Sequence, residues 1–237
     1  RPMNTGHIIR VSEHLLVACG DGVDKSFEGI FHILRTPDIM YHPFCDDFGP
    51  MNASAIIEFV KRVEAQARRS PTVDIIYIVD SNARSFTNAV FLVGAYLILK
   101  NGFHPDEVGS KFNELPSELF EGYRDATFSN RRFRLSLMDC WFGLWRAKTL
   151  GWIDMPNKQG IWGRIDQQEY DHYAHPLDAG LTTVVPGRFV ALKGPRDIPT
   201  RYRDSDAMGR VFSPDYFVSI FKALGVTDVV QLNKTKY

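Results

Sequence analysis

Cys140 and Arg146 are the residues whose spacing first suggests chemistry, because an arginine stands six positions after a thiol. Cysteine-dependent phosphoester cleavage needs a thiolate of low pKa, a backbone loop of small residues facing the phosphate, and an arginine at this spacing. The intervening residues here are Trp-Phe-Gly-Leu-Trp, which are too bulky to let the backbone wrap around an anion. They also fit a helical pattern, in which the amides are already bonded to carbonyls. We therefore predict a core helix at this place rather than a catalytic loop.

Two other groups of polar residues are candidates for a metal site and a basic patch, but neither has a spacing that predicts one. His172 and His175 are spaced like weak metal ligands, but no cysteine or further histidine lies near them, so we interpret them as a chance pair. Arg131, Arg132 and Arg134 would open a helix and are interpreted as a solvated face. The sequence has no Gly-x-Gly-x-x-Gly or Walker motif, and we expect no cofactor and no metal.

The composition restricts the class of protein. With 237 residues, 44% hydrophobic content and a formal net charge of zero, the chain is typical of a globular protein and gives no reason to expect nucleic acid as a partner. Its three widely spaced cysteines predict reduced thiols, and we expect the chain in the cytoplasm or nucleus, including association with the cytoskeleton. The longest apolar run, Ala89 to Leu99, is too short for a membrane span. The chain begins with Arg1 and not with methionine, so we expect its natural start to lie upstream.

A strand, a polar loop and a helix follow one another between Asp74 and Lys100. Residues 74–79 are a short β-branched run, typical of a buried parallel strand. The helix that follows is apolar on nearly every side through residue 100, which indicates burial. We expect a polar loop at residues 80–86, aimed at the helix N-terminus, where amides and the helix dipole favour an anion.

Other elements are expected on both sides of this unit. Residues 7–19 and 31–33 predict strands, and a helix should run from the turn at 46–52 to about residue 67. Helices are also expected at 133–150, 166–173 and 214–224, and from Pro105. A loop with exposed Trp152 and Trp162 is expected at 151–164, strands at 182–192 around a Pro-Gly turn, and a parallel-type strand at 226–233.

Seven segments, in this order and spacing, resemble the N-terminal half of the cell-division-cycle-fourteen (mitotic-exit) dual-specificity protein phosphatases. They span roughly residues 46–237. They are 47–52 (Asp-Phe-Gly-Pro-Met-Asn), 88–96, 123–126 (Tyr-Arg-Asp-Ala), 137–140, 169–173, 185–195 and 226–234.

The resemblance implies an α/β fold with two phosphatase-like domains in tandem, each a parallel-type sheet flanked by helices. Residues 1–160 would form a catalytically silent first domain, residues 161–180 a linker loop and helix, and residues 181–237 the start of a catalytic-type domain. The chain stops before the His-Cys-x5-Arg loop of that second domain, so we expect it to be inactive alone.

The resemblance also assigns candidate site residues. Counting back from the helix at 89 places Asn82 at the nucleophile position and Asn88 at the arginine position of a degenerate phosphate loop. Such a loop is chemically inert, although Arg84 and the loop amides retain some capacity for an anion. In the family, acidic residues of the linker helix and the first domain line a groove for basic residues that follow a phosphoserine–proline. The candidates here are Glu169, Asp171, Asp178 and Asp125.

Purely structural roles for these acidic residues remain as alternatives. Asp171 is equally typical of a solvated helix face, and Glu169 and Asp178 are more typical of one. Asp125 is equally typical of a carboxylate that holds a loop together by hydrogen bonds. Ala174 stands where the family has a second glutamate, which weakens the groove.

Two functions follow from the sequence. The first is the non-catalytic, substrate-recognition half of a dual-specificity phosphatase, whose cysteine lies outside this chain and whose substrates are phosphoproteins. The alternative is a pseudophosphatase or scaffold that binds a partner without catalysis. In either case the remaining part of the protein, or a partner, should cover residues 181–237, because an open sheet edge is unfavourable in water.

Overall fold

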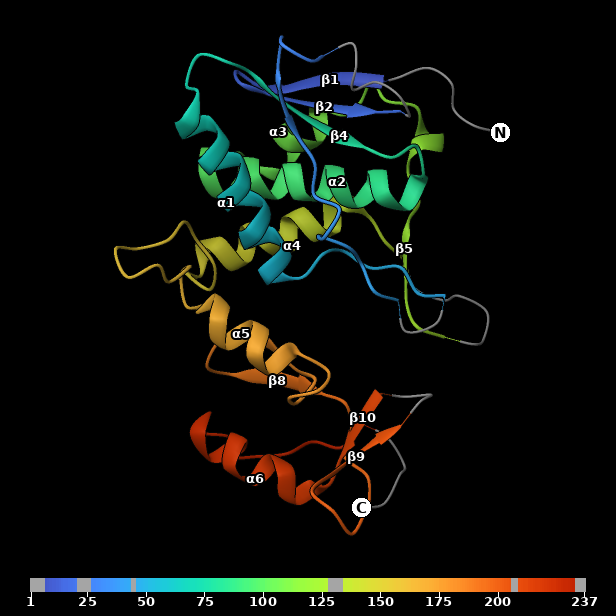
Figure 1. Ribbon diagram of the computed structural model, residues 1–237, viewed down its shortest axis with the longest axis vertical. Helices are drawn as coiled ribbons and strands as arrows, with labels where there is room; N and C mark the ends of the chain where they lie inside the picture. The colour runs from blue at the N-terminus through green and yellow to red at the C-terminus, as the bar shows by residue number, and fades with distance from the viewer. Residues whose placement is uncertain (1–6, 21–26, 44–45, 128–133, 206–208, 233–237) are drawn as a thin grey trace. The chain divides into compact units, whose positions relative to one another are not determined.

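The computed structural model describes residues 7–20, 27–43, 46–127, 134–205 and 209–232. The chain divides into two compact units, Arg1–Met155 and Pro156–Tyr237 (Figure 1). The division falls within the loop expected at 151–164. The assignment of the units to a silent domain, a linker and a catalytic-type domain stays a prediction.

Unit 1 contains a four-stranded sheet in the order β1-β2-β4-β3. Its strands are β1 (His7–Ser12), β2 (Leu15–Cys19), β3 (His32–Leu34) and β4 (Ile75–Val79). The strands β2 and β3 are both parallel to β4, with Leu15 opposite Ile75, whereas β1 is antiparallel to β2. The two central strands are almost wholly buried, as their continuous apolar sequences predict. The expected α/β fold with a parallel strand at 74–79 is confirmed.

Helix α2 (Ala83–Tyr96) is the centre of unit 1. It contacts β4 and the helices α1 (Ala53–Arg69), α3 (Pro105–Ser110) and α4 (Leu137–Thr149). Every residue from Phe86 to Tyr96 is buried, which explains why its sequence has no polar face. Figure 1 shows α1, α2 and α4 together on one side of the sheet. The remaining short elements of the unit are η2 (Leu97–Asn101), η3 (Ser117–Leu119), β5 (Tyr123–Arg124) and β6 (Arg134–Leu135).

Helix α4 begins four residues later than the sequence pattern predicts. Ser136 caps it, because the Asp139 amide donates to the Ser136 Oγ at 3.1 Å and the Ser136 amide donates to the Asp139 carboxylate at 2.8 Å. Arg134 lies in strand β6, so the prediction that the basic triad opens this helix is wrong for Arg134; Arg131 and Arg132 lie outside the described residues.

The described residues of unit 2 form two antiparallel strand pairs and two helices. Its own core contains Ala179, Leu181, Phe212 and Phe217. Asp166 caps the first helix through bonds from the Gln168 and Glu169 amides. The elements are α5 (Gln167–Ala174), β7 (Leu181–Val185), β8 (Phe189–Leu192), β9 (Tyr202–Ser205), β10 (Gly209–Phe212) and α6 (Pro214–Ala223). The predicted helices and the strands around the Pro-Gly turn are present, whereas the β9–β10 hairpin was not anticipated.

Two predictions in this unit are wrong. The described residues 226–232 form no strand, and the side chains of Val229, Val230 and Leu232 are 61%, 79% and 95% exposed. A β-branched run becomes a strand only when a neighbour supplies the ladder of hydrogen bonds, and no described strand lies beside this one. Trp162 is buried and not exposed, and its backbone exchanges hydrogen bonds with Ile165; Trp152, in unit 1, is half-buried.

Candidate functional site

The connection between β4 and α2 occupies the place of a phosphate loop, but it is only three residues long. Asn82 caps α2, because its Oδ1 accepts from the Ser85 amide at 2.8 Å and its Nδ2 donates to the Ser85 Oγ at 2.7 Å. The five residues between Asn82 and Asn88 are therefore all helical, and the polar loop expected at 80–86 ends at residue 82. The Ser85 and Phe86 amides already donate to Asn82, so this segment lacks the continuous row of free amides that phosphate cleavage requires.

Asn88 stands where a catalytic arginine would lie, and it has a structural role. It is buried, its Nδ2 donates to the Gly49 carbonyl at 3.2 Å, and its Oδ1 accepts from the Tyr123 hydroxyl at 3.0 Å. Burial raises the pKa of Tyr123, so this hydroxyl stays protonated and keeps its donor role. One amide thus joins α2 to the turn at 46–52 and to β5.

Arg84 lies in the first turn of α2 and contacts two carboxylates. Its Nε donates to Glu121 at 3.0 Å and its Nη2 to Asp46 at 3.1 Å, while the guanidinium lies 5.4 Å from the centre of the Phe48 ring. Asp46 also contacts the Nη1 of Arg124 at 2.6 Å. The hydrogen bond from Arg84, together with the charge of both arginines, holds the pKa of Asp46 below its usual value.

Sequence reasoning did not identify Asp46, Glu121 or Arg124 as members of this cluster. Arg124 belongs to the Tyr-Arg-Asp-Ala segment, and that segment was the available signal. Asp125, the candidate from the same segment, has an exposed side chain, and its carbonyl accepts from the Thr127 amide at 3.1 Å. The structure therefore places the neighbour of the predicted residue, and not Asp125 itself, in the ionic network.

The Cys140–Arg146 pair lies in helix α4, as predicted. Cys140 is half-buried, and burial together with the nearby Asp139 raises the pKa of its thiol to about 11. A thiol with this pKa is almost wholly protonated at neutral pH and is a poor nucleophile. Trp141, inside the apparent motif, is buried and donates its Nε1 to the Phe91 carbonyl at 3.2 Å.

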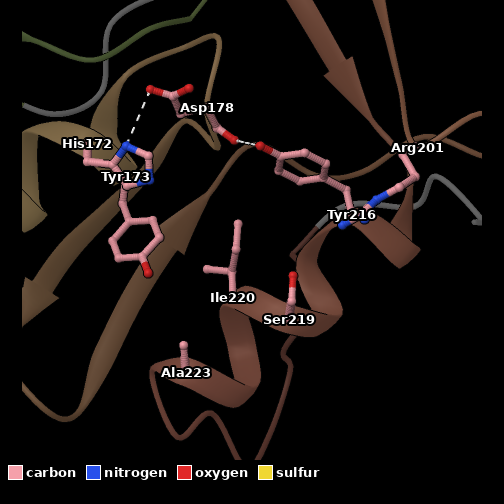
Figure 2. Close-up of a pocket in the computed structure, with 8 residues that line it drawn as sticks. All are labelled: His172, Tyr173, Asp178, Arg201, Tyr216, Ser219, Ile220 and Ala223. Atoms are coloured by element: carbon pink, nitrogen blue, oxygen red, sulfur yellow. Dashed lines mark hydrogen bonds and ion pairs between the residues drawn. The ribbon is translucent and has the colours of Figure 1, made fainter.

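The acidic candidates of unit 2 differ in their surroundings. Glu169 and Asp171 are exposed on α5. Asp178 lines a pocket of about 330 Å³, shown in Figure 2, and its carboxylate lies 3.6 Å from the Nδ1 atoms of both His172 and His175. The other residues that line the pocket are Tyr173, Arg201, Tyr216, Ser219, Ile220 and Ala223.

Two further contacts shape this pocket. The Tyr216 hydroxyl donates to the backbone carbonyl of Asp178, and the Arg201 guanidinium lies 5.6 Å from the centre of the Tyr216 ring (Figure 2). The pocket thus combines a carboxylate, a guanidinium, an imidazole and two phenol rings.

The described residues hold no group of three or more His, Cys, Asp or Glu side chains that could bind a metal ion. The histidine pair has Asp178 as its only acidic neighbour in the contacts above. Among the helices that the structure describes, none is long and apolar enough to cross a membrane.

Comparison with known proteins identifies the family. A family model described as the N-terminal half of dual specificity protein phosphatases matches residues 11–147. The chain belongs to this family. The matched residues include the capped β4–α2 connection, Asn88 and the Arg84 cluster.

Curated relatives extend the similarity beyond that domain. The chain is 26% identical over 226 residues to the tyrosine-protein phosphatase cdc-14 of Caenorhabditis elegans. This alignment covers 92% of this chain and 30% of the relative. It is 24% identical over 229 residues to the dual specificity protein phosphatase CDC14C of Symphalangus syndactylus, and this alignment covers 96% of this chain and 45% of the relative. It is 26% identical over 218 residues to the dual specificity protein phosphatase CDC14A of Mus musculus, and this alignment covers 90% of this chain and 34% of the relative. The chain thus spans less than half the length of these relatives.

Proposed function

We propose that this chain is the non-catalytic, substrate-recognition half of a dual-specificity protein phosphatase. The whole protein would hydrolyse phosphoserine, phosphothreonine and phosphotyrosine residues through a cysteine outside residues 1–237. The observation that carries the non-catalytic role is the closed β4–α2 connection, where Asn82 caps the helix and Asn88 is committed to Gly49 and Tyr123. A carboxamide cannot form a thiophosphate intermediate, and the helical backbone offers no phosphate cradle.

The recognition role rests on the acidic side chains. In unit 2, the exposed carboxylates of Glu169 and Asp171, together with half-buried Asp178, would favour basic residues that follow a phosphoserine–proline and would disfavour acidic ones. Asp125 is an exposed carboxylate of unit 1 and is a candidate for the same preference by itself. Asp178 is the least available of the four, because two imidazoles already lie 3.6 Å from its carboxylate. Asp171 stands where the family resemblance places a glutamate, so it is the residue on which we expect selectivity to depend most.

Residues 181–237 would need a cover in the whole protein. The apolar side chains of Val229, Val230 and Leu232 are largely exposed, and the segment has a strand-like sequence without a described neighbour. We propose that a further part of the protein, or a protein partner, pairs with this segment. We expect the whole protein in the cytoplasm or nucleus.

The test combines an activity assay with a binding assay on this chain. No hydrolysis of p-nitrophenyl phosphate is expected. A fluorescent peptide with phosphoserine, proline and a following lysine should bind, and the same peptide with alanine for lysine should bind more weakly. The substitution Asp171→Asn should weaken binding of the lysine peptide up to about fivefold, because an exposed ion pair contributes at most about 1 kcal/mol.

The matched control is Asp197→Asn, which removes the same charge from another exposed position of unit 2. Equal affinities of the two variants, or equal affinities of the two peptides, would remove Asp171 from the recognition surface. Hydrolysis by the chain itself would contradict the non-catalytic role.

A scaffold without catalysis is the second candidate, and Ala174 favours it. This alanine ends α5 where the family resemblance places a glutamate, so part of the acidic groove is lost. The sequence beyond Tyr237 discriminates the two functions: an intact His-Cys-x5-Arg motif supports the enzyme, and a degenerate motif supports the scaffold.

A further inference from the structure

Two arginines of unit 1 converge on one carboxylate. The Arg84 Nη2 lies 3.1 Å from one oxygen of Asp46, and the Arg124 Nη1 lies 2.6 Å from the other. The three residues come from the first turn of α2, from β5 and from the turn before Phe48, so only the fold brings them together. The helix N-terminus adds a favourable partial charge for an anion at this place.

The two arginines and their acidic partner differ in burial. The Arg124 side chain is only 8% exposed, and its Nε is buried without a hydrogen-bond partner in the described residues, whereas the Asp46 side chain is 69% exposed. The cation is thus fixed and desolvated, while the carboxylate reaches it from the solvent side. A buried donor without an acceptor is costly, so the Asp46 carboxylate satisfies this arginine incompletely.

The charges around the pair allow an exchange of anions. Arg84 and Arg124 carry two positive charges, and Asp46 and Glu121 carry two negative charges. If Asp46 leaves, the cluster has one net positive charge at a helix N-terminus. Asp46 is largely exposed, whereas Arg124 is buried and needs an anionic partner, so Asp46 can leave only when another anion takes its place.

We propose that Arg84 and Arg124 form a clamp for the phosphoryl group of a phosphoprotein, and that Asp46 is an internal occupant which the phosphoryl group displaces. The inference rests on the proposed phosphoprotein-binding function. A phosphoryl group fits better than a carboxylate for two reasons. It has three terminal oxygens for the guanidinium donors of Arg84 and Arg124, and its dianionic form carries more charge toward two cations.

The experiment measures binding to the 237-residue chain at low ionic strength, where exposed charges are least screened. Inorganic phosphate is titrated by NMR, with the amides of the first turn of α2 as the readout. A phosphoserine peptide and the same peptide with aspartate for phosphoserine are titrated by fluorescence anisotropy. Asp46→Asn removes the internal occupant. Asp38→Asn is the matched control, because Asp38 is an exposed partner of Arg62, another half-buried arginine of the same unit.

Asp46→Asn should tighten binding of inorganic phosphate and of the phosphoserine peptide about tenfold, since one competing negative charge is lost from the site. Asp38→Asn should match the wild type. Adding Arg84→Gln to Asp46→Asn should abolish the gain; Arg84 is chosen because its side chain is 36% exposed and its loss spares the buried Arg124. Circular dichroism verifies that each variant is folded.

Three results would overturn the clamp. These are an Asp46→Asn variant that binds no more tightly than the wild type, a gain that survives Arg84→Gln, and an aspartate peptide that binds Asp46→Asn as tightly as the phosphoserine peptide. Binding of inorganic phosphate without the phosphoserine peptide would also overturn it as a phosphoprotein site. The effect of Asp171→Asn on the lysine peptide is read separately, so a failed clamp and a failed recognition function are distinguished.

Discussion

The substitution Gly94→Ala should destabilise unit 1, because helix α2 meets the indole of Trp141 at this glycine. A Cβ at residue 94 would lie 2.3 Å from both the Cε2 and the Nε1 of Trp141. Carbon atoms pack at about 3.5–4.0 Å, so the indole or the backbone must move by more than about 1 Å. Neither moves easily, because Trp141 is only 2% exposed and donates to the Phe91 carbonyl at 3.2 Å.

Three contributions determine how much Gly94→Ala lowers the free energy of unfolding. Overpacking of a core costs about 1–3 kcal/mol, and loss of the indole hydrogen bond leaves a buried carbonyl unsatisfied at about 1–3 kcal/mol. Alanine favours a helix over glycine by about 1 kcal/mol, which offsets part of the cost. We expect the free energy of unfolding to fall by about 2–4 kcal/mol and the melting temperature by about 5–10 °C.

Urea and thermal unfolding, followed by circular dichroism, measure the effect. Gly143→Ala in α4 is the matched control, because a Cβ there meets nothing within 4 Å. It should stabilise the protein by about 0.5–1 kcal/mol. In a Trp141→Phe background, which removes the clashing indole atoms, Gly94→Ala should cost clearly less than in the wild type. An equal cost in both backgrounds, or the same sign for Gly94→Ala and Gly143→Ala, would refute the steric explanation.

Three more predictions concern single groups of unit 1. Burial raises the pKa of the Cys140 thiol from 9.0 to about 11, so iodoacetamide should alkylate it at pH 8 about a hundredfold more slowly than an exposed model thiol. Mass spectrometry of the peptide that contains Cys140 measures the rate, and a rate near that of the model thiol would contradict the burial. Asn88→Ala leaves the Tyr123 hydroxyl without its acceptor and should lower the free energy of unfolding by about 1–3 kcal/mol in urea titrations, whereas an unchanged midpoint would show that water replaces the amide. The pKa of the Asp74 carboxyl lies below its ordinary value of 3.8, and the largest cause is the hydrogen bond from Arg10. The ionised carboxylate therefore stabilises the fold at a pH above the pKa of Asp74 in the unfolded chain. This stabilisation is lost as the pH falls through the lower pKa of Asp74 in the folded chain. Asp74→Asn should therefore reduce stability at pH 7 and matter less and less below about pH 4 in thermal melts; a loss independent of pH would disprove the ionic explanation.

Local signals in the sequence determined the main elements of this protein. The apolar spacing of α1, the β-branched run of β4, the apolar sequence of α2 and the proline at the start of α3 each act over a few residues. They therefore predict strands and helices without knowledge of distant neighbours. The same kind of reasoning excluded a catalytic loop at Cys140, because bulky residues in a helical pattern cannot form a phosphate cradle.

Only the tertiary structure decided what these elements hold together. Asp46, Arg84 and Arg124 form one cluster, and Asn88 joins α2 to β5, although no local pattern links residues so far apart in the chain. The run at 226–232 has the composition of a strand but forms none, because a strand exists only where a neighbour completes its hydrogen bonds. Periodicity reports the face that a residue occupies on its own element, whereas ion pairs and sheet partners depend on which distant segments the fold brings within a few ångströms.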